Sequence, residues 1–305
     1  MSFLTNADQG NNRISGYILT LCIVVLCYAV LGSIPLIVHL TIVNGGGKGA
    51  LSGNMSDWTA LLGENTVLVY LLFPFVLVLL TLVLSNRFIH KRTILSLFTS
   101  RTKFDWKRFF LSAGIWTGVM SLLLGAMMVG NNHIQWNMNP STIIPLILIS
   151  LLLIPIQTTA EEVLFRGYLF QAFGQKNRRG WMTVFVTGVL FGLMHAANPE
   201  VQTLGYGVMS YYMITGIFLG LMVLMDDGLE LSMGYHAANN IFAALILTNE
   251  WQAFQTDALW IDHAKPTFGW DVIATMLVLQ PLLLVVFAKI FSWKNLRSKL
   301  LDQQD

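Results

Sequence analysis

Charged residues are scarce in this sequence. They make up 11% of its 305 residues, whereas soluble domains carry roughly 25%. Hydrophobic residues make up 55% and gather into runs of about 18 residues or more, the length needed to cross a hydrocarbon core roughly 30 Å thick. A soluble chain would show short amphipathic stripes instead. We therefore expect an all-α, polytopic membrane helix bundle.

Three further absences narrow the class of protein. The sequence has two cysteines, Cys22 and Cys27, both inside the first apolar run, which favours small buried residues over a disulfide or a metal pair. No basic patch with interleaved aromatic residues is present, so we expect no nucleic-acid partner. Residues 1–12 lack the positive region of a signal peptide, and the run that follows is too long for one. We expect that run to be a retained first helix.

Eight apolar runs are candidate membrane spans within a single membrane domain, residues 1–305. They cover residues 15–41, 66–85, 109–130, 141–173, 181–197, 208–225, 229–248 and 271–291. Gly32 and Pro35 predict a kink in the first span.

The distribution of basic residues indicates how the spans are oriented. Fifteen of the 18 lysines and arginines fall in segments that eight spans with a cytoplasmic N-terminus would place in the cytoplasm. The exceptions are Lys48 and Lys265 in outer loops and Arg166 in the fourth span. Both termini are therefore expected in the cytoplasm. The compact loops and the lack of an organelle signal favour a multi-pass protein of a bacterial cell membrane.

Three charged residues interrupt the fourth span. Glu162 and Arg166 are four residues apart, so they share a helix face and can pair. Glu161 is rotated about 100° from Glu162 around the helix, so it is not needed for this pair and can take another role. A charged group in a membrane helix costs several kcal/mol, so such groups mark functional sites by default. A carboxylate in a cavity of low dielectric suits a general base.

Histidines occupy two later spans. His195 follows Phe191 by one helical turn in the fifth span, and Asn240 follows His236 by one turn in the seventh. Antiparallel packing would place Glu161 and His195 at a similar depth. His236 lies near the start of its span, so that helix must tilt, or begin deeper, for His236 to join them.

These motifs together resemble the CPBP intramembrane proteases, the family of CAAX prenyl endopeptidases and bacteriocin-processing proteins. The resemblance covers residues 140–248, which correspond to a catalytic core of helices four to seven. The motifs are EExxxR at Glu161, Glu162 and Arg166, FxxxH at Phe191 and His195, and HxxxN at His236 and Asn240.

The resemblance implies hydrolysis of a peptide bond by an activated water inside the bilayer. Glu161 would be the base, and His195 would help to bind the same water. His236 and Asn240 would stabilise the oxyanion. The remaining motif residues would support the site: Glu162, Arg166 and Phe191. The substrate would be a peptide or protein that enters from the membrane or the cytoplasmic face, and the sequence does not reveal whether it is prenylated.

Two mechanisms fit the same residues. Glu161, His195 and His236 are candidates for three zinc ligands with an open fourth position. The sequence has no HExxH motif, and a metal-free mechanism that relies on glutamate and water needs the same side chains. The choice between zinc and no metal stays open at this point.

Other functional classes were weighed against the protease. A non-proteolytic membrane factor, such as a bacteriocin immunity or regulatory protein, could use the same scaffold. A small transporter could relay protons through buried Glu and His residues, but the sequence shows no repeated half. Asp226, Asp227 and Glu230 are expected to form a solvated turn between the sixth and seventh spans, and His90 is expected in a solvated loop.

Overall fold

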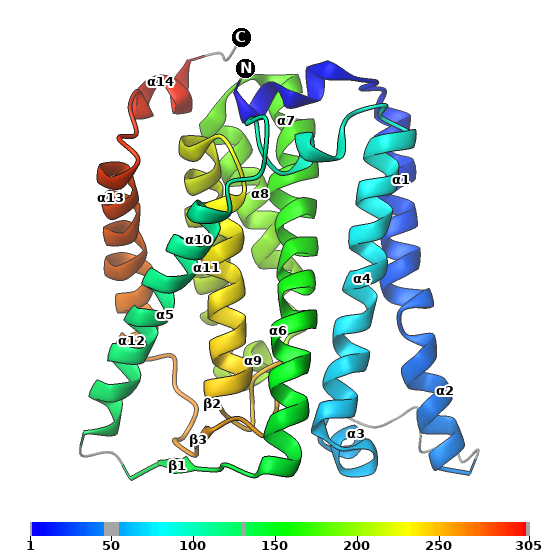
Figure 1. Ribbon diagram of the computed structural model, residues 1–305, viewed down its shortest axis with the longest axis vertical. Coiled ribbons are helices and arrows are strands. Elements are labelled where there is room, and N and C mark those ends of the chain that lie inside the picture. The colour runs from blue at the N-terminus through cyan, green and yellow to red at the C-terminus, as the bar shows by residue number, and fades with distance from the viewer. Residues whose placement is uncertain (1, 46–54, 130–131, 303–305) are drawn as a thin grey trace.

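The computed structural model describes residues 2–45, 55–129 and 132–302 as a bundle of helices (Figure 1). The N-terminal and C-terminal ends of the chain lie at the same end of this bundle. Two predicted positions, Lys48 in an outer loop and Gly130 at the end of the third span, lie outside the described residues.

The bounds of the elements follow, with η marking 3-10 and π helices. The first half contains η1 (Phe3–Gln9), α1 (Ile14–Leu26), η2 (Cys27–Leu31), α2 (Ile34–Val43), α3 (Met55–Leu62), α4 (Glu64–Phe88), η4 (Ile94–Leu97), α5 (Trp106–Met128) and β1 (Ile134–Trp136). The second half contains α6 (Pro140–Glu162), η5 (Val163–Leu169), α7 (Phe170–Asn177), α8 (Gly180–Met194), α9 (Pro199–Leu204), α10 (Val208–Asp226), α11 (Glu230–Ile241), η6 (Phe242–Ile246), β2 (Leu247–Thr248), β3 (Trp260–Asp262), α12 (Trp270–Ala274), η7 (Thr275–Leu279), α13 (Gln280–Ile290) and α14 (Leu296–Leu301).

Six helices within the described residues are long and apolar enough to cross a membrane. They are Ile14–Val43, Glu64–Phe88, Trp106–Met128, Pro140–Lys176, Val208–Asp226 and Val272–Ile290. The other two predicted spans are helical but shorter: α8, and α11 continued by η6. The all-α, polytopic membrane bundle is confirmed, whereas eight crossings and the cytoplasmic side of the termini stay predictions.

The first span bends where the sequence predicts. Its π-helical segment η2 ends at Leu31, and α2 begins after Gly32 and Ser33. At Gly32 the helix passes so close to α4 that an added Cβ would lie 2.6 Å from Cβ of Pro74. Glycine is needed here because any side chain would collide with this neighbouring helix.

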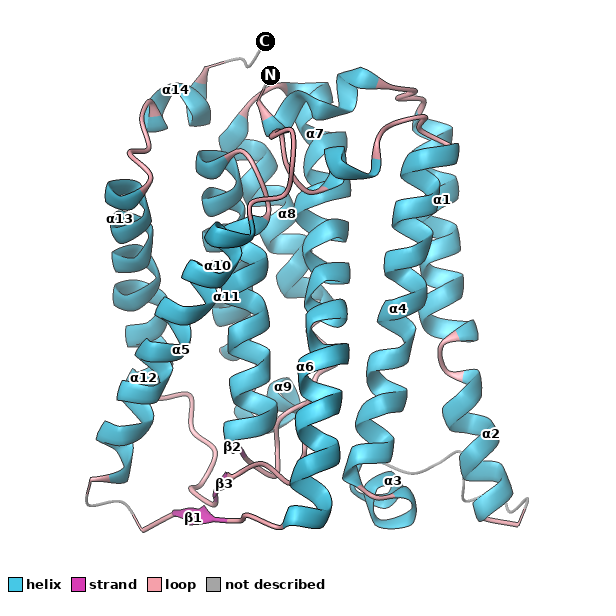
Figure 2. Ribbon diagram, viewed as in Figure 1, coloured by secondary structure: helices cyan, strands magenta, loops and turns pink. Residues whose placement is uncertain are grey.

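A three-stranded sheet lies at the end of the bundle opposite the termini (Figure 2). Its strand order is β1-β3-β2, with β1 antiparallel and β2 parallel to β3. Between this sheet and the termini, α8 packs against α10, and α11 packs against both α10 and α6.

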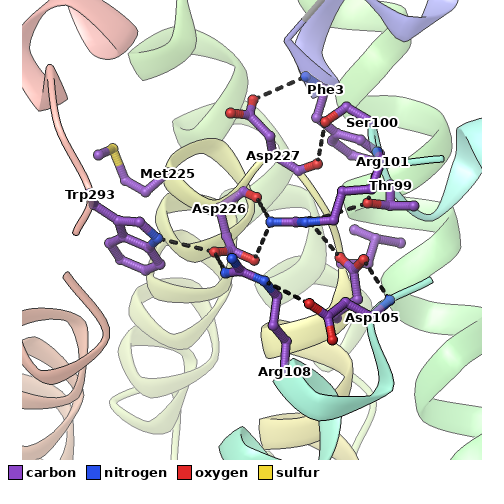
Figure 3. Close-up of polar contacts among 12 residues, drawn as sticks. Phe3, Thr99, Ser100, Arg101, Asp105, Arg108, Met225, Asp226, Asp227 and Trp293 are labelled. Atoms are coloured by element: carbon purple, nitrogen blue, oxygen red, sulfur yellow. Dashed lines mark hydrogen bonds and ion pairs between the residues drawn. The ribbon is translucent and has the colours of Figure 1, made fainter. Parts of the chain in front are cut away.

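Asp226 and Glu230 of the acidic turn between α10 and α11 are buried, so the prediction that the turn is solvated was wrong for these two residues, whereas Asp227 is partly exposed. Asp226 is 4% exposed and Glu230 is fully buried. Arg101 lies 3.1 Å from a carboxylate oxygen of each, and Arg108 forms a second ion pair with Asp226. Figure 3 shows both arginines converging on Asp226.

A covering loop explains this burial. The backbone of the loop after η4 pairs with the turn: the N–H of Leu229 donates to the carbonyl of Phe98, and the N–H of Ser100 donates to the carbonyl of Asp227. This loop therefore covers the start of α11. In Figure 1 the first turn of α11 lies further than η1 from the end of the bundle that holds the termini. This covered start agrees with one of the two arrangements expected for His236, a helix that begins deeper.

Both terminal segments also reach this turn through Asp227. The N–H of Phe3 donates to Oδ1 of Asp227 at 3.1 Å (Figure 3). From the other end of the chain, Lys299 pairs with Oδ2 of Asp227 and donates to the carbonyl of Leu224 at 3.0 Å. Lys299 also donates to the carbonyl of Met225, so it supplies a donor to two carbonyls in the last turn of α10, where partners within the helix run out.

His90 is also buried, contrary to the prediction of a solvated loop. The residue is 0% exposed. Its Nδ1 contacts the carbonyl of Asn11 at 2.8 Å, and its Nε2 contacts the hydroxyl of Tyr168 at 2.6 Å. Burial lowers the pKa of this histidine.

The ion pairs under the covering loop should contribute measurably to stability. Asp226→Asn leaves Arg101 and Arg108 without this carboxylate, and we expect a loss of roughly 1–3 kcal/mol, because both arginines keep some contact with solvent. Thermal unfolding in detergent, followed by tryptophan fluorescence, measures the effect. Glu250→Gln is the matched control, since the side chain of Glu250 is 80% exposed and its ion pair, with the partly exposed His263, lies outside this turn. Equal melting temperatures for Asp226→Asn and wild type would contradict the structural role.

Candidate active site

The two glutamates lie where the α-helix of the fourth span changes into a π-helix. Glu161 and Glu162 end α6, and Arg166 lies in the π-helical segment η5 that follows. Such π segments inside α-helices occur frequently at functional sites, because they redirect the side chains around the extra residue.

Glu162 and Arg166 form an ion pair that is closed to solvent. Their side chains are both 0% exposed, and the guanidinium donates to Oε1 of Glu162 at 2.9 Å. The guanidinium also donates to the carbonyl of Gly216 at 3.1 Å and lies 4.1 Å from the ring centroid of Phe191. One carboxylate, one backbone carbonyl and one ring face from three helices thus surround this charge.

His236 bridges the two glutamates. Its Nδ1 lies 2.9 Å from Oε1 of Glu162, and its Nε2 lies 3.5 Å from Oε2 of Glu161. The hydrogen bond to Glu162 requires a hydrogen on Nδ1. The second ring nitrogen therefore faces Glu161 with its orientation fixed by the first.

The two oxygens of Glu161 have different surroundings. Oε1 accepts a hydrogen bond of 2.6 Å from the side-chain amide of Gln157. That amide accepts in turn from Nδ2 of Asn240 at 3.1 Å. Oε2 is buried and has no hydrogen-bond partner among the described residues. Its lone pairs are therefore available to a water molecule or to a substrate.

The hydrogen-bonded chain continues beyond Asn240. Asn239 donates to Oδ1 of Asn240 at 3.1 Å, and the indole of Trp116 donates to Oδ1 of Asn239 at 3.2 Å. Side chains of α5, α11 and α6 are thereby linked in one line that ends at Glu161. One of the two amide hydrogens of Asn240 is used in this chain, and the other is not.

His195 lies at the end of α8 and is held separately. Its Nδ1 contacts the carbonyl of Phe191 at 2.8 Å, and its ring stacks on Tyr212 with centroids 4.3 Å apart. This leaves Nε2 as the free ring nitrogen. Among the described residues no hydrogen bond or ion pair joins His195 directly to Glu161.

A cavity of about 1420 Å³ unites these groups. Glu161, His195, His236 and Asn240 line it together with Gln157, and most of the remaining lining is apolar. Glu162 and Arg166 are not part of its lining. The structure therefore brings the four predicted catalytic residues to one cavity and places the ion pair behind it.

The three candidate zinc ligands are not assembled into a metal site. Within the described residues, no group of three His, Cys, Asp or Glu side chains is placed to hold a metal ion. Glu161 and His236 are in contact, whereas His195 shares with them only the lining of the cavity. Zinc binding by Glu161, His195 and His236 stays a prediction.

Three polar residues of this site, Gln157, Asn239 and Tyr212, were not predicted from the sequence. Gln157 is one helical turn before Glu161, so the spacing rule that paired Glu162 with Arg166 would have found it. Asn239 was hidden because adjacent residues on a helix usually face different ways. Tyr212 lies in another span, and its stacking on His195 is a tertiary contact that no local pattern encodes.

Comparison with known proteins gives a family and one relative. A model of the family described as "Type II CAAX prenyl endopeptidase Rce1-like" matches residues 140–242, which include every position of the three motifs. The "Uncharacterized protein YyaK" of Bacillus subtilis (strain 168) is 30% identical over 218 residues, which cover 71% of each chain. No solved structure matches the sequence.

The buried ion pair predicts a specific pattern of stability. Glu162→Gln leaves Arg166 as an uncompensated charge and weakens the contact to His236, so we expect a loss of roughly 3–5 kcal/mol. Adding Arg166→Met removes the stranded charge and should restore part of this loss. Thermal unfolding in detergent compares both variants with wild type. An unchanged melting temperature for Glu162→Gln alone would show that the pair does not hold the site.

Proposed function

The chain belongs to the Rce1-like family of type II CAAX prenyl endopeptidases, and from this premise we propose that it hydrolyses a peptide bond with a water molecule activated by Glu161. The observation that carries the proposal is Oε2 of Glu161, a cavity-lining residue: this oxygen accepts no hydrogen bond from the described residues and lies 3.5 Å from Nε2 of His236. The family and the apolar helices support a multi-pass membrane protein. A bacterial cell membrane is proposed as its location.

The reaction would begin with a water held between Oε2 of Glu161 and Nε2 of His195. Glu161 takes one proton from this water while the oxygen attacks the carbonyl carbon of the scissile bond. Collapse of the tetrahedral intermediate breaks the carbon–nitrogen bond, and the proton on Glu161 passes to the leaving amine. A glutamate that changes from base to acid balances the protons over one turnover.

Two donors would stabilise the negative oxygen of the intermediate. Asn240 has one amide hydrogen outside its bond to Gln157. His236 would donate from Nε2 when both ring nitrogens carry hydrogen, with Glu162 holding Nδ1. Donors fixed in place before the reaction are effective because they need no reorganisation as charge develops.

Gln157 and Glu162 would act as positioning residues. Gln157 holds one oxygen of Glu161, which fixes the direction of the other. Glu162 holds one nitrogen of His236, which fixes the direction of the other. In both cases one side of a reactive group is occupied by protein, so that its second side faces the cavity.

Replacing the base tests the proposed function directly. Glu161→Ala should lower cleavage by a factor of about 10² to 10⁴ or more while the protein stays folded and inserted. Substrates that accumulate on this variant can be identified by mass spectrometry and then offered to wild type. Shortened products with wild type and intact ones with Glu161→Ala are expected. A partner that wild type binds and never shortens would instead identify a non-proteolytic factor, and normal turnover by the variant would disprove the assignment.

Metal dependence is a separate question that chelation answers. The metal-free form of the mechanism predicts full activity after dialysis against a chelator, with a metal content well below one ion per chain by elemental analysis. Activity that disappears on chelation and returns with zinc alone would favour ligation by Glu161, His195 and His236. The Glu161→Ala variant is the control, because a bound zinc ion should be weakened by the loss of that ligand.

A further inference from the structure

The same cavity contains a second carboxylate, on the short helix that follows His195. Glu200 of α9 lines the cavity, and its Oε1 accepts the backbone N–H of Ala253 at 2.8 Å. Its Oε2 is buried and has no hydrogen-bond partner among the described residues. Glu161 and Glu200 therefore both line the cavity. Each has one oxygen that accepts a hydrogen bond and one that accepts none among the described residues.

The charge of this region is one-sided. The cavity lining within the described residues includes no lysine or arginine. An unpaired carboxylate in such surroundings is costly, and burial raises the pKa of Glu200 accordingly. A cation that enters the cavity would remove this cost, since it would pair with a carboxylate that is already desolvated.

The loop that contains Ala253 also contains a hydrogen-bond donor without a partner among the described residues. Trp251 precedes Ala253 by two residues and also lines the cavity. Its indole Nε1 is buried without a hydrogen-bond partner among the described residues. A ligand that satisfies both groups carries a donor for Glu200 and an acceptor for Trp251, and a cationic donor is favoured because the lining has no positive charge of its own.

We infer that Glu200 and Trp251 form a subsite for a lysine or arginine residue of the peptide substrate. The cationic side chain pairs with Oε2 of Glu200, and a carbonyl oxygen of the peptide backbone accepts from Nε1 of Trp251. A peptide supplies both groups, whereas a simple cation supplies only the charge. Aromatic walls such as the ring of Tyr212 suit a guanidinium or ammonium group.

The subsite adjoins the proposed reaction centre. Glu200 is five residues after His195, and Tyr212, which stacks on His195, lines the same cavity. A bound basic residue would therefore lie within a few residues of the cleaved bond. This inference rests on the proposed function, because it assigns one specificity to that same cavity.

Cleavage profiling tests the subsite. Purified full-length protein in detergent is incubated with a peptide library made from digested cellular protein, and the cut sites are read by mass spectrometry. Wild type should favour lysine or arginine at one fixed position, and Glu200→Gln should reduce this preference about tenfold or more. Glutamine keeps an oxygen for the N–H of Ala253 and removes the charge. The control Glu250→Gln should keep the preference, because Glu250 is an exposed residue of the loop that contains Trp251.

A preference for basic residues that persists in Glu200→Gln, or that wild type lacks, would overturn the subsite while leaving the proposed hydrolysis intact. A binding measurement separates the two if wild type cleaves nothing. Benzylammonium should raise the melting temperature of wild type more than benzyl alcohol does, and this difference should vanish in Glu200→Gln but remain in Glu250→Gln. Equal shifts with both compounds in wild type would overturn the cation site by themselves.

Discussion

The site depends on one interaction, the ion pair between Glu162 and Arg166. Two opposite charges without solvent contact are tolerated only where their partners offset the cost of desolvation. The partners of Arg166 are Glu162, the carbonyl of Gly216 and the face of Phe191, and Glu162 also accepts from His236. These partners come from α6 with η5, α8, α10 and α11. The requirement to satisfy one buried arginine therefore sets the relative positions of the central helices.

Glu161 lies next to this ion pair on the same helix but faces a different part of the molecule. A helix turns by about 100° per residue, so adjacent glutamates face different environments. Glu162 is directed at Arg166 and His236 and lies outside the cavity lining, whereas Glu161 lines the cavity and has an oxygen there without a hydrogen bond among the described residues. The chain thus contains a structural carboxylate and a reactive one side by side. Glu200 repeats the second arrangement at another point of the cavity, with one oxygen held by Ala253 and the other unpaired.

The sequence predicts those features that depend on local spacing. Helical spans, the bend after Leu31 and the pairing of Glu162 with Arg166 all follow from hydropathy and from the geometry of a single helix. The position of His236 does not, because it depends on a loop more than 100 residues earlier in the chain that covers the start of α11. Burial of Asp226 has the same origin. Contacts between distant segments of this kind leave no periodic signal in one sequence.

The proposed mechanism requires that Glu161 activates water and does not attack the peptide bond itself. A single turnover of wild type in water enriched in oxygen-18, with a substrate captured on the Glu161→Ala variant, tests for attack by Glu161. Activation of water places one heavy oxygen in the new C-terminal carboxylate of the product and none in the side chain of Glu161, as read by digestion and mass analysis. A heavy oxygen in the Glu161 carboxylate after that first turnover would show that water had opened a covalent acyl intermediate at Glu161, and it would contradict the mechanism.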